Sequence, residues 1–115
     1  MMTLNLAAAA IGGRTVGDAV FESVGTDSRH LPRQALFVAL RGENFDGHDF
    51  VIAAANEGAA AAMVDSTWAS SAPACPIPLL VVADTRAGLG ALAAARDVPT
   101  FTHARFLSAI EPQSS

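Results

Sequence analysis

The sequence predicts an α/β fold, with a small mixed, partly parallel sheet flanked by helices. Its 115 residues suit one domain with a modest core, because about half of them are apolar and most of those are alanine or valine. Continuous apolar runs of strand length occur at residues 34–40, 59–64 and 79–83, and such runs are typical of strands covered on both faces. Segments with helical patterning alternate with these runs, which indicates helices packed on a sheet.

The first third of the chain predicts one helix and several short strands. "TLNLAAAAIGG" (residues 3–13) reads as a helix that Thr3 or Asn5 caps and that Gly12 and Gly13 end. Loosely alternating apolar and polar residues at 15–17 and 19–28 predict short extended segments. The first buried strand, "QALFVAL" (34–40), follows them.

The second half alternates helix and strand more clearly. Asp49 is expected to cap a helix over residues 50–57, with Gly58 just past its end. The strand at 59–64 leads to "STWASSAPACPIP" (66–78), which we expect to be a loop because it is rich in serine and proline. After the strand at 79–83, Asp84 or Thr85 should cap a helix over 86–96. We expect residues 1–95 to form the domain and the polar tail at 96–115 to be poorly ordered.

Composition excludes several classes of function. The net charge is −4, so the chain lacks the positive charge that attracts nucleic acid. All seven basic residues are arginine, so there is no lysine for a phosphate loop or a Schiff base. Cys75 is alone, which argues against disulfides and cysteine-ligated metals. No apolar run is long enough to span a bilayer and the N-terminus lacks a basic signal-peptide region, so we expect a cytoplasmic protein without a membrane partner.

Two polar motifs follow predicted strands. "TDSR" (26–29) suits a turn, but its hydroxyls could also bond a base or ribose, and its arginine could grip a phosphate. In "GENFDGHDF" (42–50), Asp46-Gly47 is expected to supply a turn with positive φ. An Asn44 amide beside the Phe45 ring suits the imide edge and the flat face of uracil.

Other candidates have simpler interpretations. Asp46, His48 and Asp49 could ligate a metal, and would then make a metal-dependent hydrolase, but three such groups within four residues rarely converge on one ion. His30 and His103 are expected at the surface, and Trp68 as a cover over the edge of the core. "GLGAL" (88–92) lacks the spacing of a dinucleotide loop and suits a close contact between helix and sheet.

Together these segments resemble the N-terminal domain of bacterial Mur ligases, the ATP-dependent enzymes that build the peptidoglycan stem peptide. The stretch "GTDSRHLPRQALFVALRGENFDGHDFVIAAANEGAAAAMV" carries the resemblance, which extends from about Leu4 through "LLVVADTRAGLGALAAA". Within the family, "GENFDGHDF" is most similar to the ligases that add D-alanyl-D-alanine to UDP-N-acetylmuramoyl-tripeptide. The ligases that add the third residue are the near alternative.

The resemblance implies a substrate-binding role. The family's N-terminal domain holds the uridine diphosphate end of a UDP-N-acetylmuramoyl-peptide, which implies contacts to uracil, ribose or uridine from residues in both motifs. The implied substrate-binding residues are Thr26, Ser28, Arg29, Glu43, Asn44 and Phe45. Whether Arg29 reaches a phosphate or braces its loop stays open.

The resemblance stops near residue 95. The family's phosphate loop, with its ATP and magnesium, and its amino-acid-binding domain have no counterpart in "DVPTFTHARFLSAIEPQSS" (97–115). We therefore expect no catalytic residue, no metal and no cofactor in this chain, no ligation by it alone, and a reading frame cut by a frameshift or early stop. One alternative is a degenerate domain that no longer uses its uridine-binding site. Another is an interaction module that self-associates through the surface that the missing domains would otherwise cover.

Overall fold

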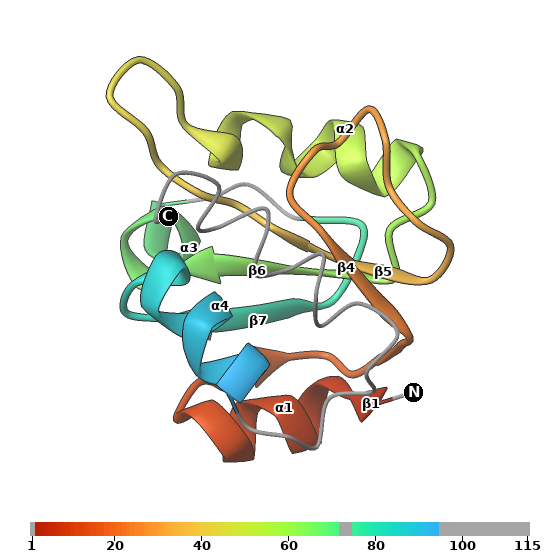
Figure 1. Ribbon diagram of the computed structural model, residues 1–115, viewed down its shortest axis with the longest axis vertical. Helices are drawn as coiled ribbons and strands as arrows, with labels where there is room; N and C mark the ends of the chain where they lie inside the picture. The colour runs from red at the N-terminus through yellow and green to blue at the C-terminus, as the bar shows by residue number, and fades with distance from the viewer. Residues whose placement is uncertain (1, 72–74, 95–115) are drawn as a thin grey trace.

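A five-stranded mixed sheet forms the centre of the molecule in the computed structural model, which describes residues 2–71 and 75–94 (Figure 1). The strand order is β2 (Arg14–Val16), β7 (Leu79–Val82), β6 (Ala61–Asp65), β5 (Ala35–Val38) and β4 (Ser23–Gly25). Strands β4 to β7 are parallel, whereas β2 pairs antiparallel with β7 at one edge. The mixed, partly parallel α/β fold that the sequence predicts is therefore confirmed.

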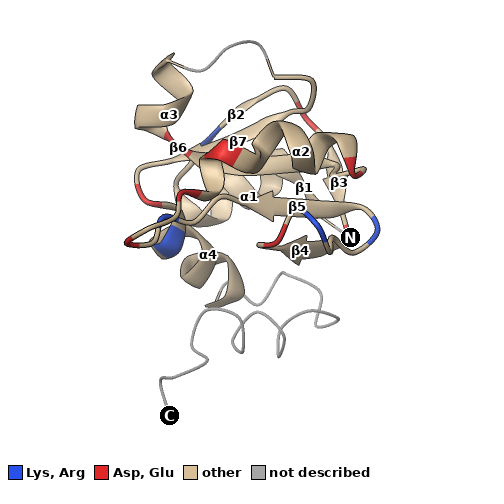
Figure 2. Ribbon diagram, turned by 90° about the horizontal axis from the view of Figure 1, so that it is seen from above, with Lys and Arg blue, Asp and Glu red and all other residues tan. Residues whose placement is uncertain are grey.

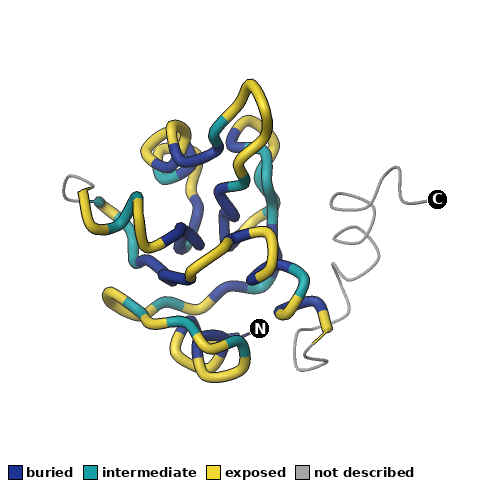
Figure 3. Tube along the Cα trace, turned by 90° about the vertical axis from the view of Figure 1, so that its left-hand side faces the viewer, coloured by how far each residue is buried: buried dark blue, intermediate teal, exposed yellow. Residues whose placement is uncertain are grey.

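Helices cover both faces of this sheet. Helices α1 (Leu4–Ile11) and α4 (Thr85–Ala94) lie on one side, and α2 (Val51–Asn56) lies on the other (Figure 1). Alternate side chains of β5 supply the two cores: Leu36 and Val38 pack with the α1 and α4 side chains, while Phe37 packs with α2. Every residue of β5, β6 and β7 is buried, as continuous apolar runs require of strands covered on both faces. Buried segments run through the interior of the molecule, whereas exposed segments lie mainly at its periphery (Figure 3).

The N-terminal helix follows its predicted limits closely. The Thr3 side chain accepts a hydrogen bond from the Leu6 backbone N–H, and Gly12 ends the helix with a left-handed φ of 83°. A small second sheet, which the sequence did not predict, pairs β1 (Met2–Thr3) with β3 (Val20–Phe21).

Three predictions about local structure are wrong. The segment predicted as a loop at 66–78 begins with helix α3 (Ser66–Ser71). The Asp65 carboxylate caps this helix by accepting the Trp68 N–H. The serine- and proline-rich composition of the segment gives no sign of this cap. The remainder of that segment bears out the loop, except for residues 72–74, which lie outside the described part. Trp68 packs on the core as expected.

The cap predicted for the helical segment that precedes β6 is also wrong. A 3₁₀ helix, η1 (Gly47–Phe50), precedes α2, and Asp46 rather than Asp49 caps it by accepting the His48 N–H at 2.9 Å. Gly47 does not have the positive φ that the sequence predicted. It is needed instead for close approach, because a Cβ there would lie 2.8 Å from the Leu40 backbone nitrogen.

Charged residues lie mainly in loops and at the ends of elements (Figure 2). In the described ranges, no helix has the length and apolar character needed to cross a membrane. The tail predicted at 96–115, together with His103, lies outside the described residues.

Candidate functional site

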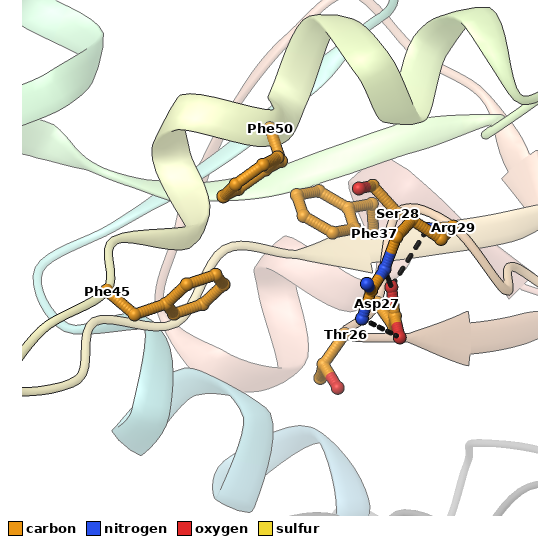
Figure 4. A pocket seen from close by; sticks show the side chains of 7 residues that line it. All are labelled: Thr26, Asp27, Ser28, Arg29, Phe37, Phe45 and Phe50. Atoms are coloured by element: carbon orange, nitrogen blue, oxygen red, sulfur yellow. Dashed lines mark hydrogen bonds and ion pairs between the residues drawn. The ribbon is translucent and has the colours of Figure 1, made fainter.

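The two motifs singled out in the sequence meet at the carboxyl edge of the parallel sheet. The loop after β4 carries Thr26 to Arg29, and the loop after β5 carries Phe45 and leads to Phe50. Together they enclose a hollow of about 330 Å³, which we call the edge hollow (Figure 4). Its lining residues are Thr26, Asp27, Ser28, Arg29, Phe37, Phe45 and Phe50.

Aromatic rings form much of the hollow. Phe37 is buried and belongs to β5, whereas Phe45 and Phe50 are 52% and 39% exposed. The Phe45 and Phe50 rings stack on each other, with centroids 5.4 Å apart and planes inclined by 18°. Exposed, nearly parallel rings offer flat apolar faces, which suit a planar ligand.

The opposite side of the hollow is polar. Ser28 is 7% exposed and lines the hollow, and its hydroxyl makes no hydrogen bond to any other residue within 2–71 and 75–94. Buried hydroxyls are normally paired, so Ser28 is available to a ligand or to water. Thr26 adds a second hydroxyl on the same strand-to-loop junction.

Arg29 is folded back onto its own loop. Its backbone N–H donates to Asp27 Oδ1 at 2.9 Å, and its guanidinium donates to the same carboxylate from Nε at 3.1 Å. The side-chain hydrogen bond from Arg29 is the largest influence that lowers the pKa of Asp27. Because the Arg29 side chain is 81% exposed, this pair braces the loop only weakly.

The loop between β4 and β5 closes tightly against the sheet. The Ser23 hydroxyl donates to the Arg33 carbonyl at 2.7 Å. A Cβ on Gly25 would lie 2.8 Å from the Leu31 side chain and 3.1 Å from Pro32 Cδ, so a larger residue there would force the Leu31 side chain to move. The shape of the edge hollow therefore depends on the residues that lead back into β5 as well as on the "TDSR" motif.

Glu43 and Asn44 do not line the edge hollow. Arg41 and Asp46 pair as an antiparallel bridge, and the Gly42 N–H donates to the Phe45 carbonyl at 2.6 Å. This pairing leaves Glu43 and Asn44 exposed at the tip of a hairpin-like loop. Four of the six predicted residues therefore converge on the hollow, and these two stand outside it.

A polar network around the buried His48 supports the base of this loop. His48 donates or accepts at both ring nitrogens, with Asp46 Oδ1 at 2.7 Å from Nδ1 and the Asp65 backbone nitrogen at 3.0 Å from Nε2. Arg41 joins the two carboxylates, with Nε 2.8 Å from Asp65 and a terminal nitrogen 2.6 Å from Asp46.

Both carboxylates of the network are held in their charged form. The Arg41 hydrogen bond is the largest influence on Asp65 and lowers its pKa. For Asp46, burial pushes the pKa upward, but hydrogen bonds from the backbone and ring of His48 outweigh burial and lower the pKa overall.

A second, wider hollow of about 400 Å³ lies further along the same edge, after β6 and β7. Arg41, Asp65, Asp84 and Arg86 line it with Ala83 and Thr85. Asp84 caps α4 there by accepting the N–H groups of Arg86 and Ala87 at 2.9 and 3.3 Å. Two arginines face two carboxylates, so neither sign of charge dominates.

The described residues do not fit a metal site at Asp46, His48 and Asp49. They do not fit the ATP and magnesium of the Mur ligases that the sequence resembles either. Within the described ranges, no three His, Cys, Asp or Glu side chains gather as metal ligands. Asp46 and His48 bond each other instead, and Asp49 is exposed. The chain also has no lysine with which to build a phosphate loop.

Sequence reasoning missed Asp27, Phe37 and Phe50 as lining residues. Asp27 lies inside the "TDSR" motif, and Phe50 ends "GENFDGHDF", so motif membership could have included both. The sequence predicts Phe37 only as a core residue of a strand. No local signal distinguishes a phenylalanine in the core from one that also lines a hollow.

Comparisons with known proteins show what this chain is similar to. Residues 20–97 match the family described as "Mur ligase family, catalytic domain". The chain is 44% identical over 77 residues to UDP-N-acetylmuramoyl-tripeptide–D-alanyl-D-alanine ligase of Escherichia coli K12, covering 67% of this chain and 16% of that protein. It is equally 44% identical over 78 residues to UDP-N-acetylmuramoyl-L-alanyl-D-glutamate–2,6-diaminopimelate ligase of Streptomyces coelicolor, covering 68% of this chain and 15% of that protein.

A solved structure shows the same fold. MurF from Acinetobacter baumannii superimposes with a TM-score of 0.66 at 33% identity, covering 81% of this chain and 20% of that one. The chain therefore spans a small part of the length of these three relatives, between 15% and 20%. The resemblance to the N-terminal domain of these ligases is confirmed.

Proposed function

This chain belongs to the Mur ligase family, and we propose that its edge hollow binds the uridine diphosphate end of a UDP-N-acetylmuramoyl-peptide. The observation that carries the proposal is the convergence of two separate loops on one hollow. One loop brings the hydroxyls of Thr26 and Ser28, and the other brings exposed aromatic rings. A pyrimidine nucleoside needs both kinds of group, one for its polar edges and one for its flat face.

The size of the hollow favours a nucleoside rather than the whole precursor. Its volume of about 330 Å³ lies at the small end of ligand pockets, which begin at about 300 Å³. We assign the base to the face of Phe45 and Phe50, and the ribose or base edge to Thr26 and Ser28. Stacking on an aromatic ring contributes about 1–3 kcal/mol, and each hydrogen bond about 1 kcal/mol.

Arg29 is assigned to the diphosphate. Its guanidinium has five N–H donors, and the bonds to Asp27 use only some of them. A phosphate at the rim would then be held by Arg29 while Asp27 keeps the side chain in place. Glu43 and Asn44, at the exposed loop tip, would reach the ligand only if the loop closes over it.

We assign the domain to a ligase of the D-alanyl-D-alanine-adding type, supported by the phrase "GENFDGHDF". Relatives of both types match equally well, so a functional test is needed. Residues 2–94 would replace the corresponding domain in the E. coli relative and in the S. coelicolor relative. Restored ligation only in the D-alanyl-D-alanine-adding chimaera supports the assignment, and restoration only in the other refutes it.

Calorimetric titration of the purified chain with UDP-N-acetylmuramoyl-tripeptide and with UDP tests the binding site. Both ligands should bind, and Phe45→Ala should weaken binding by about 5- to 150-fold, the equivalent of one stacked base. Leu6→Ala is the matched control, because Leu6 is 53% exposed on α1, away from the hollow. Asn44→Ala tests whether the loop tip takes part.

Two results would contradict the proposal. The first is no heat and no thermal shift with millimolar ligand. The second is equal binding by the Phe45→Ala and Leu6→Ala proteins. Dimerisation that rises with protein concentration and ignores UDP would favour the self-association alternative instead.

A further inference from the structure

His48 is the most completely buried polar side chain near the edge hollow, although it does not line it. Its side chain has no exposed surface, and it lies at the start of η1, between the loop after β5 and the end of β6. The Trp68 ring packs beside it with centroids 5.7 Å apart. A histidine in this position is too deep to touch a ligand, so any effect on binding must act through the loop.

The hydrogen bonds define one state of the imidazole. The Asp65 backbone N–H can only donate, so Nε2, at 3.0 Å, must accept and carries no proton. The single ring proton is therefore on Nδ1, which donates to the Asp46 carboxylate at 2.7 Å. A proton on Nε2 would point at the Asp65 N–H, and Asp65 Oδ2, at 3.6 Å, is too far to accept it.

This tautomer braces the aromatic loop internally and ties it to the sheet: Nδ1–H bonds Asp46 within the loop, and Nε2 accepts from Asp65 in β6. Asp46 follows Phe45 directly, and Asp65 is the last residue of β6. Arg41, at the other end of the hairpin-like loop, bonds both of these carboxylates. The Gly47 N–H also donates to the Leu40 carbonyl at 2.7 Å, so the loop is closed at its base while its tip stays free.

We propose that His48, as the neutral Nδ1–H tautomer, is a positioning residue that locks the loop at residues 41–50 so that Phe45 and Phe50 present a preformed face to the ligand. The assignment of a ligand to this face rests on the proposed function. The locking of the loop does not, because it is a property of the ligand-free protein. When a binding-competent state is only partly populated, the apparent affinity falls by that fraction.

Two substitutions separate the two bonds. In His48→Asn, the amide nitrogen replaces Nδ1 and can still donate to Asp46, but the Asp65 N–H loses its acceptor. In His48→Gln, the amide oxygen can replace Nε2 as the acceptor for Asp65, but the bond to Asp46 is lost. Phe21→Leu is the control, because Phe21 is fully buried in the core on the opposite face of the sheet.

Three measurements test the proposal: imidazole ¹⁵N shifts, backbone ¹⁵N order parameters for residues 42–46, and calorimetric titration with UDP. We expect the shifts to place the ring proton on Nδ1 and none on Nε2. Lower order parameters should occur in both His48 variants but not in Phe21→Leu at similar thermal stability. Binding of UDP should weaken about three- to tenfold in the His48 variants, as for a competent loop populated about 10–30% of the time, and should be unchanged in Phe21→Leu.

The outcomes separate the two hypotheses. A wild-type chain that does not bind UDP refutes the proposed function, and the ¹⁵N data then decide the role of His48 alone. A doubly protonated or Nε2–H ring overturns the positioning role, as does an unchanged loop in both His48 variants. If the loop loosens equally in Phe21→Leu, His48 contributes only general stability and the proposal is wrong.

Discussion

Replacing Gly47 by alanine tests the close approach that shapes the aromatic loop. Gly47 has no positive φ, so alanine meets no conformational penalty there. The new Cβ would instead lie 2.8 and 2.9 Å from the backbone nitrogen and oxygen of Leu40, and 3.1 Å from Ala39 Cα. All three atoms are backbone and cannot rotate away, so the loop or β5 must shift.

The magnitude follows from two contributions. Overpacking in a tight site costs about 1–3 kcal/mol. The shift also strains the hydrogen bond from the Gly47 N–H to the Leu40 carbonyl, now 2.7 Å, and such bonds contribute about 0.5–1.5 kcal/mol each. We expect Gly47→Ala to lower the free energy of unfolding by about 2–4 kcal/mol, a large share of the stability of a small domain.

Gly90→Ala is the matched control for this measurement. Apart from its own stretch of helix, no atom of residues 2–71 and 75–94 lies within 4 Å of its added Cβ, and Gly90 is inside helix α4. Alanine is favoured over glycine in a helix by about 1 kcal/mol, so this variant should be more stable than the wild type. Urea unfolding followed by the fluorescence of Trp68, the single tryptophan, compares the three proteins. A Gly47→Ala protein as stable as the wild type would refute the steric reasoning.

Three further predictions concern capping and charge. Asp84→Ala should cost about 1 kcal/mol in urea unfolding by removing the cap of α4, and a loss as small as that of an exposed surface change would contradict this role. Thr3→Ala should cost about 0.5–1 kcal/mol, with Thr3→Ser largely restoring the cap; failure of serine to restore it would point to lost packing. Because the pKa of Asp46 and that of Asp65 are lowered below 3.8, their stabilisation should be complete above about pH 4 and be lost as the pH falls further. Urea midpoints between pH 7 and 3 measure this loss, which Asp65→Asn should reduce; an equally steep loss in that variant would contradict the assignment.

Strands with continuous apolar runs were predictable because burial on both faces leaves a local signature. The runs at 34–40, 59–64 and 79–83 correspond to β5, β6 and β7. Helix α1 was equally clear, since Thr3 and Gly12 mark its ends by their own side-chain and backbone chemistry.

Helix α3 and the cap at Asp46 were not predictable in the same way. Asp65 belongs to a strand, yet its carboxylate caps the helix that follows, so one residue serves two elements. Asp46 and Asp49 both precede α2 and both suit a cap. The choice between them depends on the Arg41 and His48 side chains that hold Asp46 in place.

By itself, the sequence determined the fold class, the buried strands and the two polar motifs, because periodicity and residue type are properties of neighbours along the chain. Only the tertiary structure decided that Thr26 and Ser28 face Phe45 across one hollow, that Phe37 and Phe50 belong to it, and that Glu43 and Asn44 stand outside. Parallel pairing of β4 with β5 brings the ends of both strands to the same edge. That register joins residues far apart in sequence, and no local pattern encodes which side chains then point inward.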